Sequence, residues 1–99
     1  MLNLNQTMEN GKCTVALEGR LDTVTSPDLE AMLKTVMPEV TELVLDFGKL
    51  DYISSAGLRV LLSAQKVMNQ QGSLKVINVA ESVMEIFDIT GFSDILTIV

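Results

Sequence analysis

The stretch of residues 51–62 places the strictest constraint on the fold, because it joins a short apolar segment to a helical pattern through two adjacent serines. Serine is a favoured helix N-cap, since its side-chain oxygen accepts a hydrogen bond from a backbone N–H group of the first turn. One of Ser54 and Ser55 can therefore cap this helix, and the other lies on its first turn. The positive end of the helix dipole favours a negative charge there, so a phosphoryl group would be tolerated.

The size and charge of the chain limit the classes of protein to which it can belong. A length of 99 residues fits one domain with a single core, and we expect that domain to span residues 1–99. Hydrophobic residues make up 47% of the chain and aromatic residues only 4%, which indicates a folded protein with an aliphatic core. The net charge of -6 disfavours direct binding of nucleic acids and of anionic membrane surfaces.

Several absences in the sequence narrow the possible chemistry. No apolar run is long enough to cross a bilayer and no signal peptide is apparent, so we expect a cytoplasmic protein without membrane insertion. Cys13 is the single cysteine, which fits a reducing compartment, and its place in an alternating segment predicts that it is buried and inert. The sequence has no histidine and no phosphate-binding Gly-x-x-x-x-Gly-Lys pattern. We therefore expect no enzymatic activity, metal or cofactor, although weak nucleotide binding at the helix N-terminus stays open.

The first half of the chain predicts a hairpin, a helix and a strand. Alternating segments over residues 2–8 and 12–19 flank Asn10-Gly11, a pair favoured in tight hairpin turns. Ser26 and Pro27 are typical of an N-cap and a first helical residue, and Pro38 ends this helix. Residues 42–47 predict a short central strand buried on both faces, followed by a turn over residues 48–51. The expected core positions are Cys13, Val15 and Leu17 on the second strand and Leu29, Met32, Leu33 and Val36 on the helix.

The second half predicts two further helices and two further strands. The helix after the serines is expected over residues 55–69, and a third helix over residues 81–89, ended by a left-handed Gly91. Strands are expected over residues 74–79 and 95–99. The buried positions of the two helices are expected to be Val60, Leu61, Ala64, Val67 and Met68, then Val83, Ile86 and Phe87, with Arg59, Gln65, Lys66 and Asn69 on the polar side of the first. The order β-β-α-β-α-β-α-β predicts an α/β fold, a mixed sheet with its helices mainly on one face.

Three motifs resemble signatures of the STAS domain, the family of bacterial anti-sigma factor antagonists. The sequence Tyr-Ile-Ser-Ser-Ala-Gly-Leu-Arg-Val-Leu-Leu over residues 52–62 is similar to the central signature of that family. Gly-Arg-Leu-Asp over residues 19–22 resembles the motif after its second strand, and residues 86–92 resemble its closing helix and turn. Because the motifs occur in the family's order across the whole chain, the protein is identified as a member of the family.

The resemblance implies a partner-switching protein. Such a protein binds an anti-sigma factor that has serine kinase activity, and so frees a sigma factor; phosphorylation of a serine breaks the complex, and a serine phosphatase restores it. The family's phosphorylated serine aligns with Ser55, whereas Ser54 stands where the family has an aspartate. The resemblance places the partner contacts at two neighbouring loops and the start of a helix, namely at Asp22, Thr23, Ser54, Ser55, Ala56, Gly57, Leu58, Arg59 and Leu62.

Each of these residues also has a purely structural explanation. A serine pair before a helix commonly serves only as a cap, and Gly57 allows close packing of a helix on a sheet. Asp22 is suited to fixing its own loop. Arg59 is explained by solvation, or by contact with an acidic partner or a phosphate. Leu58 favours the core, and Leu62 lies between core and interface.

A second function stays open because Ser54 departs from the family's pattern. The chain is also compatible with a small STAS subunit of a lipid-transport ATPase complex, or with another STAS scaffold that is not phosphorylated. Genes for a kinase or a sigma factor nearby would favour the first function, and genes for an ATPase with a permease the second. An exposed sheet face or the edge at Leu62 would suit self-association as well as partner binding, so the oligomeric state is open.

Overall fold

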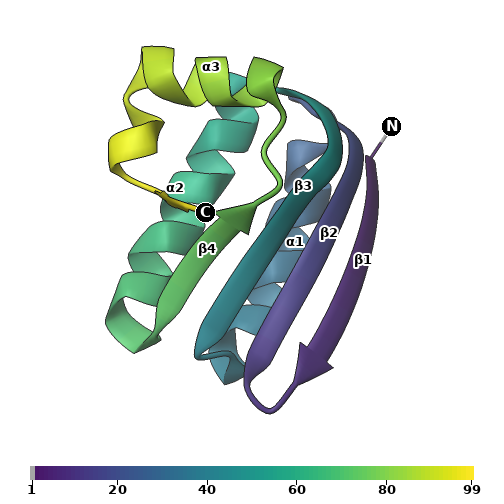
Figure 1. Cartoon of the computed structure of the whole chain (residues 1–99). Helices are drawn as coiled ribbons and strands as arrows, with labels where there is room; N and C mark the ends of the chain where they lie inside the picture. The colour runs from purple at the N-terminus through teal and green to yellow at the C-terminus, as the bar shows by residue number, and fades with distance from the viewer. Residues whose placement is uncertain (1) are drawn as a thin grey trace.

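The fold is a five-stranded sheet with two helices against one face and a third helix at one end, in a computed structural model that describes residues 2–99 (Figure 1). The strands lie side by side in chain order. β1 pairs antiparallel with β2, and every later neighbour is parallel, so the sheet is mixed. The strands are β1 (Leu2–Glu9), β2 (Lys12–Leu21), β3 (Glu42–Ile53), β4 (Ser73–Ile77) and β5 (Thr97–Ile98).

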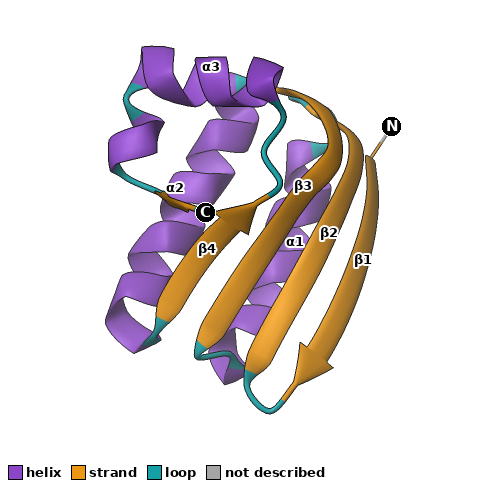
Figure 2. Ribbon diagram, in the orientation of Figure 1, coloured by secondary structure: helices purple, strands orange, loops and turns teal. Residues whose placement is uncertain are grey.

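Helices connect the parallel strands, and α1 and α2 cover the same face of the sheet. Figure 2 shows α1 (Ser26–Val36) and α2 (Ser55–Gln71) behind the strands, with α3 (Glu81–Thr90) across the end where β3 and β4 lead out of the sheet. Two single 3-10 turns, η1 (Met37–Glu39) and η2 (Phe92–Asp94), follow α1 and α3. The predicted fold class, element order and one-sided placement of the helices are therefore confirmed.

The core forms where the alternating faces of the strands meet the helices. Cys13 and its face-mates Val15 and Leu17 are buried as predicted, and burial raises the pKa of the Cys13 thiol. The three successive apolar residues of β3 are also all buried. The ring centroids of Phe47 and Phe87 lie 6.2 Å apart, so α3 is anchored to β3 by an aromatic pair.

Two predicted turns have the expected backbone geometry. Asn10 and Gly11 take φ angles of 49° and 81°, the left-handed values that a tight two-residue hairpin needs. Gly91 has a φ of 83° and ends α3, which continues one residue past its predicted end to Thr90. Both turns therefore follow from local chemistry.

The turn predicted over residues 48–51 is wrong, because β3 continues without interruption to Ile53. The pairing of β3 with β2 shifts register twice, and each shift leaves one extra residue in β3. At the first shift, the Asp46 Oδ1 atom accepts a hydrogen bond of 2.9 Å from the backbone N–H of Gly48. Residues that commonly form turns therefore form a β-bulge within a long strand here.

The predicted helix ends and faces need four corrections. Thr25, not Ser26, is the N-cap of α1; Ser26 is the first helical residue, and its hydroxyl donates to the Asp22 carbonyl oxygen. The 3-10 turn at η1 contains Pro38, so α1 itself stops at Val36. α2 runs two residues further than predicted, to Gln71. On α2, Val67 is 38% exposed while Gln65 is only 6% exposed, because packing sets the rotation of the helix within its apolar pattern.

The strands after α2 are shorter than predicted. β4 ends at Ile77, because the next residue, Asn78, takes a left-handed φ of 58°. The strand predicted over residues 95–99 forms only at Thr97–Ile98, since η2 occupies residues 92–94 and Ile95 is 45% exposed. β5 pairs only with Lys75 and Val76 and closes one edge of the sheet.

Candidate functional site

The two loops singled out by sequence meet at one edge of the sheet. Leu21 and Ile53 are paired residues at the ends of the parallel strands β2 and β3. The pairing continues for one residue, since the Ser54 N–H donates to the Leu21 carbonyl oxygen at 2.8 Å. The Asp22 loop (residues 22–25) therefore lies beside the serine junction (residues 54–58), as expected where the carboxyl ends of parallel strands share an edge.

The two serines of the junction have different roles. Ser54 is the N-cap of α2, with extended backbone, and its hydroxyl oxygen accepts a hydrogen bond of 3.4 Å from the Gly57 N–H. Ser55 is the first residue of α2 and is exposed. The sequence predicted one capping serine and one on the first turn, and the structure assigns these roles to Ser54 and Ser55 respectively.

Gly57 brings the start of α2 close to the sheet. A Cβ atom at this position would lie 2.8 Å from Leu21 Cγ and 2.9 Å from Ile53 Cγ1, which is closer than carbon atoms can pack. Leu58 follows Gly57 into the core and is 6% exposed, whereas Leu62 is half-buried. The structural explanations of Gly57 and Leu58 are thus confirmed.

Asp22 organises its loop by accepting hydrogen bonds. Its Oδ1 atom accepts from the backbone N–H groups of Val24 and Thr25, each at 3.0 Å. The hydrogen bond from the Thr25 N–H is the main reason that the pKa of the Asp22 carboxyl lies below its ordinary value, with the Arg20 charge adding a smaller effect. The loop therefore holds a carboxylate that is ionised at neutral pH.

A groove opens between the first turns of α1 and α2, with a volume of about 310 Å³. Three predicted residues, Thr23, Ala56 and Arg59, line this α1–α2 groove. The remaining lining residues were not anticipated as part of the site. Ser26, Pro27 and Glu30 belong to α1 and reach it only through tertiary packing, and Val60 of α2 was expected in the core. The other predicted residues do not line the groove: Asp22, Ser54, Ser55, Gly57, Leu58 and Leu62.

Val24 is a further residue of this edge that sequence reasoning missed. Its side chain is 82% exposed at the tip of the Asp22 loop, next to Thr23 of the groove. A single valine between threonines carries no recognisable pattern, so only the folded loop shows it as an exposed apolar side chain. It adds an exposed apolar side chain to this edge of the sheet.

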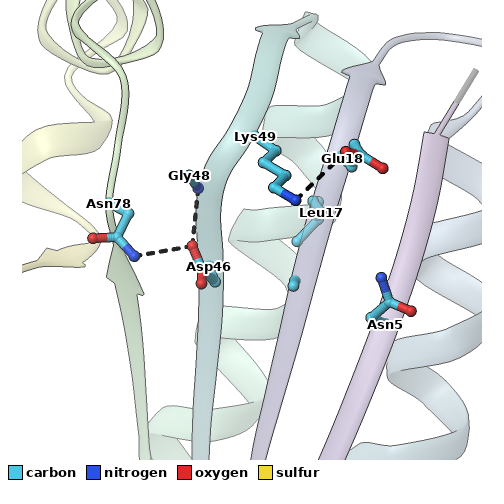
Figure 3. Close-up of a pocket in the computed structure, with 8 residues that line it drawn as sticks. Asn5, Leu17, Glu18, Asp46, Gly48, Lys49 and Asn78 are labelled. Carbon is cyan, nitrogen blue, oxygen red and sulfur yellow. Dashed lines mark hydrogen bonds and ion pairs between the residues drawn. The ribbon is translucent and has the colours of Figure 1, made fainter.

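A second hollow lies on the sheet face that no helix covers, with a volume of about 400 Å³. In Figure 3, Asp46 lies between Gly48 and Asn78, and Lys49 points toward Glu18. Asp46 accepts a hydrogen bond of 3.1 Å from the Asn78 amide, and the Lys49 Nζ atom lies 3.9 Å from a Glu18 carboxylate oxygen. Four polar side chains of this hollow thus pair with one another, Asp46 with Asn78 and Lys49 with Glu18.

Comparison with known proteins identifies the family. The model of the STAS domain matches residues 3–99 of the chain. The chain belongs to the STAS domain family. Its sequence is 38% identical over 91 residues to BtrV of Bordetella bronchiseptica, an alignment covering 90% of this chain and 78% of BtrV. It is 30% identical to the anti-sigma-B factor antagonist of Bacillus subtilis, with 98% of this chain and 90% of that protein covered.

Solved structures place the chain in the same fold group. The crystal structure of an anti-sigma factor antagonist from Mycobacterium paratuberculosis superposes with a TM-score of 0.90, at 20% identity, over 99% of this chain and 85% of that one. This STAS chain thus has the fold that the motifs predicted. None of the helices within residues 2–99 is long and apolar enough to cross a membrane.

Proposed function

We propose that this STAS protein is an anti-sigma factor antagonist that binds an anti-sigma factor with serine kinase activity and thereby frees a sigma factor. Its relatives named as antagonists, over almost the whole chain, support this role. The observation that carries the proposal is that Ser55 is exposed on the first turn of α2. Its neighbour Ser54 caps the helix, so the Ser55 hydroxyl is not needed as a cap. The role is non-enzymatic and cytoplasmic, and it uses residues 1–99 as one domain.

The proposed partner surface combines the Asp22 loop with the start of α2. Thr23, Ser55 and Arg59 are exposed, and Ala56 and Leu62 are partly so, which suits direct contact. The buried residues Gly57 and Leu58 contribute indirectly, by setting how closely the start of α2 packs on the sheet. Asp22 and Ser54 contribute through hydrogen bonds that hold the backbone of the Asp22 loop and of the serine junction. Val24 extends this surface at the tip of the Asp22 loop.

Phosphorylation of Ser55 is proposed to switch the complex off. A phosphoryl group adds about -1.5 to -2 charges, and the first turn of α2, which has no acidic residue, would accept it without loss of fold. A partner that covers Ser55 would have to bury this charge, at a cost of several kcal/mol, or roughly a thousandfold in affinity. A serine phosphatase would restore the binding form.

The proposal is tested by calorimetry with the cognate anti-sigma factor, which a kinase gene next to the gene for this chain would identify. We expect Ser55→Ala to bind like the wild type and Ser55→Asp to bind about tenfold to a hundredfold more weakly, since aspartate carries less charge than phosphate. Gln70→Glu is the control, because it adds a negative charge at an exposed position of the same helix, fifteen residues and about 22 Å along the axis from Ser55. Equal affinities for Ser55→Ala and Ser55→Asp would refute the switch.

Mass spectrometry of the protein from its native cells, with phosphatases inhibited, tests the modification itself. Phosphate on Ser55 is the expected result. The alternative, a STAS scaffold or a small subunit of a lipid-transport ATPase complex, is favoured by Ser54 in place of the family's aspartate. Complete absence of phosphate from a well-covered peptide containing Ser54 and Ser55 would favour that alternative, with Ser55 as an ordinary first-turn residue.

A further inference from the structure

Arg59 lies one helical turn after Ser55 and is the cation nearest to it along α2. The Arg59 Nε atom lies 3.5 Å from the Ser55 carbonyl oxygen, at the outer limit of a hydrogen bond, so the guanidinium already rests on the first turn. Within residues 2–99, no carboxylate oxygen lies within 4.0 Å of Arg59. Its donors are thus largely uncommitted.

The other arginine of this edge is occupied. The guanidinium carbon of Arg20 lies 4.5 Å from the centroid of the Tyr52 ring, and its Nε atom lies 3.9 Å from Asp22 Oδ2. Asp22 in turn accepts hydrogen bonds from its own loop. Of the two arginines, Arg59 is therefore the one whose side-chain donors are free for a new anion on the first turn of α2.

We propose that Arg59 binds the phosphoryl group of phosphorylated Ser55 within the same chain, and in doing so leaves the α1–α2 groove. This inference rests on the proposed phosphorylation of Ser55 and specifies how that charge is received. Residues four apart face each other on a helix, and an anion placed before a cation is the favourable order. A guanidinium also matches phosphate oxygens with two parallel hydrogen bonds, which lysine does not.

The movement would change the charge of the groove. Arg59 is the only basic residue in the lining of the α1–α2 groove, and Glu30 of α1 is the only acidic one. Glu30 already lies 4.0 Å from Lys34 on its own helix, so it does not hold Arg59 in place. Once Arg59 turns to the phosphate, Glu30 is the only charged residue left in the lining of the groove. Phosphorylation of Ser55 would thus change the charge of a surface that two helices form.

The test uses full-length protein carrying phosphoserine introduced at position 55 during translation, so that no kinase is needed. Phosphorus-31 NMR follows the second ionisation of the phosphate in the otherwise wild-type protein and in Arg59→Gln. Because a bound guanidinium stabilises the dianion, we expect the midpoint to be about half a pH unit lower with Arg59 present. The Arg59 Nε–H signal should also shift in the phosphorylated protein and not in the unmodified one.

Lys66→Gln serves as the control, because it removes the same charge from an exposed position of α2. Lys66 lies eleven residues from Ser55, about 16 Å along the helix, which exceeds a Debye length of about 8 Å at physiological salt. Its midpoint should equal that of the wild type. Coincident midpoints for the wild type and Arg59→Gln, with an unshifted Nε–H signal, would overturn the inference. That result would leave the proposed switch intact, whereas an absence of phosphate in native cells would refute the switch and not the affinity of Arg59.

Discussion

Among single residues, Asp22 makes a contribution to the stability of the protein that depends on pH. Its carboxylate is stabilised in the folded state by the backbone N–H groups of Thr25 and Val24, so its pKa is lowered on folding. A lowered pKa contributes stability that is present above the unfolded value, near 3.8, and that is lost as the pH falls through the folded value. We expect Asp22→Asn to be less stable than the wild type at neutral pH.

Urea unfolding of the wild type and Asp22→Asn at a series of pH values checks this expectation. The difference between the two unfolding free energies should begin to shrink as the pH falls through the unfolded pKa near 3.8. It should be smallest below the folded pKa, where the wild-type carboxyl is protonated in both states. An NMR titration of Asp22 gives the folded pKa directly. A stability difference that persists unchanged into acid would show that the loop depends on shape and not on the carboxylate charge.

At the scale of the element, the two serines at the start of α2 should contribute differently to stability, because only Ser54 caps the helix. Ser54→Ala removes the acceptor for the Gly57 N–H and should destabilise the protein by about 0.5–1 kcal/mol, the lower part of the range for N-caps, because the hydrogen bond is long. Ser55→Ala should change stability by less than about 0.5 kcal/mol, since its side chain is exposed on the first turn. Thermal or urea unfolding of the pair gives both values.

The comparison between these variants also bears on function. If Ser55→Ala proved as destabilising as Ser54→Ala, Ser55 would have a structural duty, and loss of binding in its variants could not be assigned to charge. Ser54→Asp introduces the aspartate that the resemblance to the family implies at this position. Because aspartate and serine rank equally as N-caps and aspartate complements the helix dipole, the fold should tolerate that change.

For the whole molecule, Gly57 sets the separation between the helical layer and the sheet. Gly57→Ala would place a methyl group within 3 Å of the side chains of Leu21 and Ile53, both of which are buried in the core. Despite the better helix propensity of alanine, we expect a loss of about 1–3 kcal/mol in the free energy of unfolding. Urea unfolding measures this loss, and Ser63→Ala on the exposed side of the same helix is the control.

The displacement should also reach the site. Because Gly57 lies between Ser55 and Arg59, raising the start of α2 would alter the α1–α2 groove as well as stability. In NMR spectra of Gly57→Ala, the changes in amide shifts should therefore extend across the groove to Ser26 and to the α1 residues that follow Pro27. An alanine variant as stable as the wild type, with shifts confined to α2, would mean that the helix adjusts locally and the close packing is not essential.

Local patterns in the sequence anticipated most elements and the identity of the central residues. The alternation of β2, the Asn10-Gly11 turn and the left-handed Gly91 depend on neighbouring residues only, and all were predicted correctly. Errors arose where distant segments decide. The composition of residues 48–51 is that of a turn, but pairing with β2 keeps them in β3 as part of a bulged strand.

The sequence by itself determined the fold class and a serine-capped start of α2, because capping and periodicity act over a few residues. The structure assigned the cap to Ser54 and the first helical position to Ser55. Tertiary structure alone decided which face of α2 is covered, so that Gln65 is buried and Val67 half-exposed. It also decided that the Asp22 loop and α1 complete a groove beside Ser55. The reason is physical: parallel pairing of β2 with β3 joins residues about thirty positions apart, and only packing of the helices on that sheet sets their rotation.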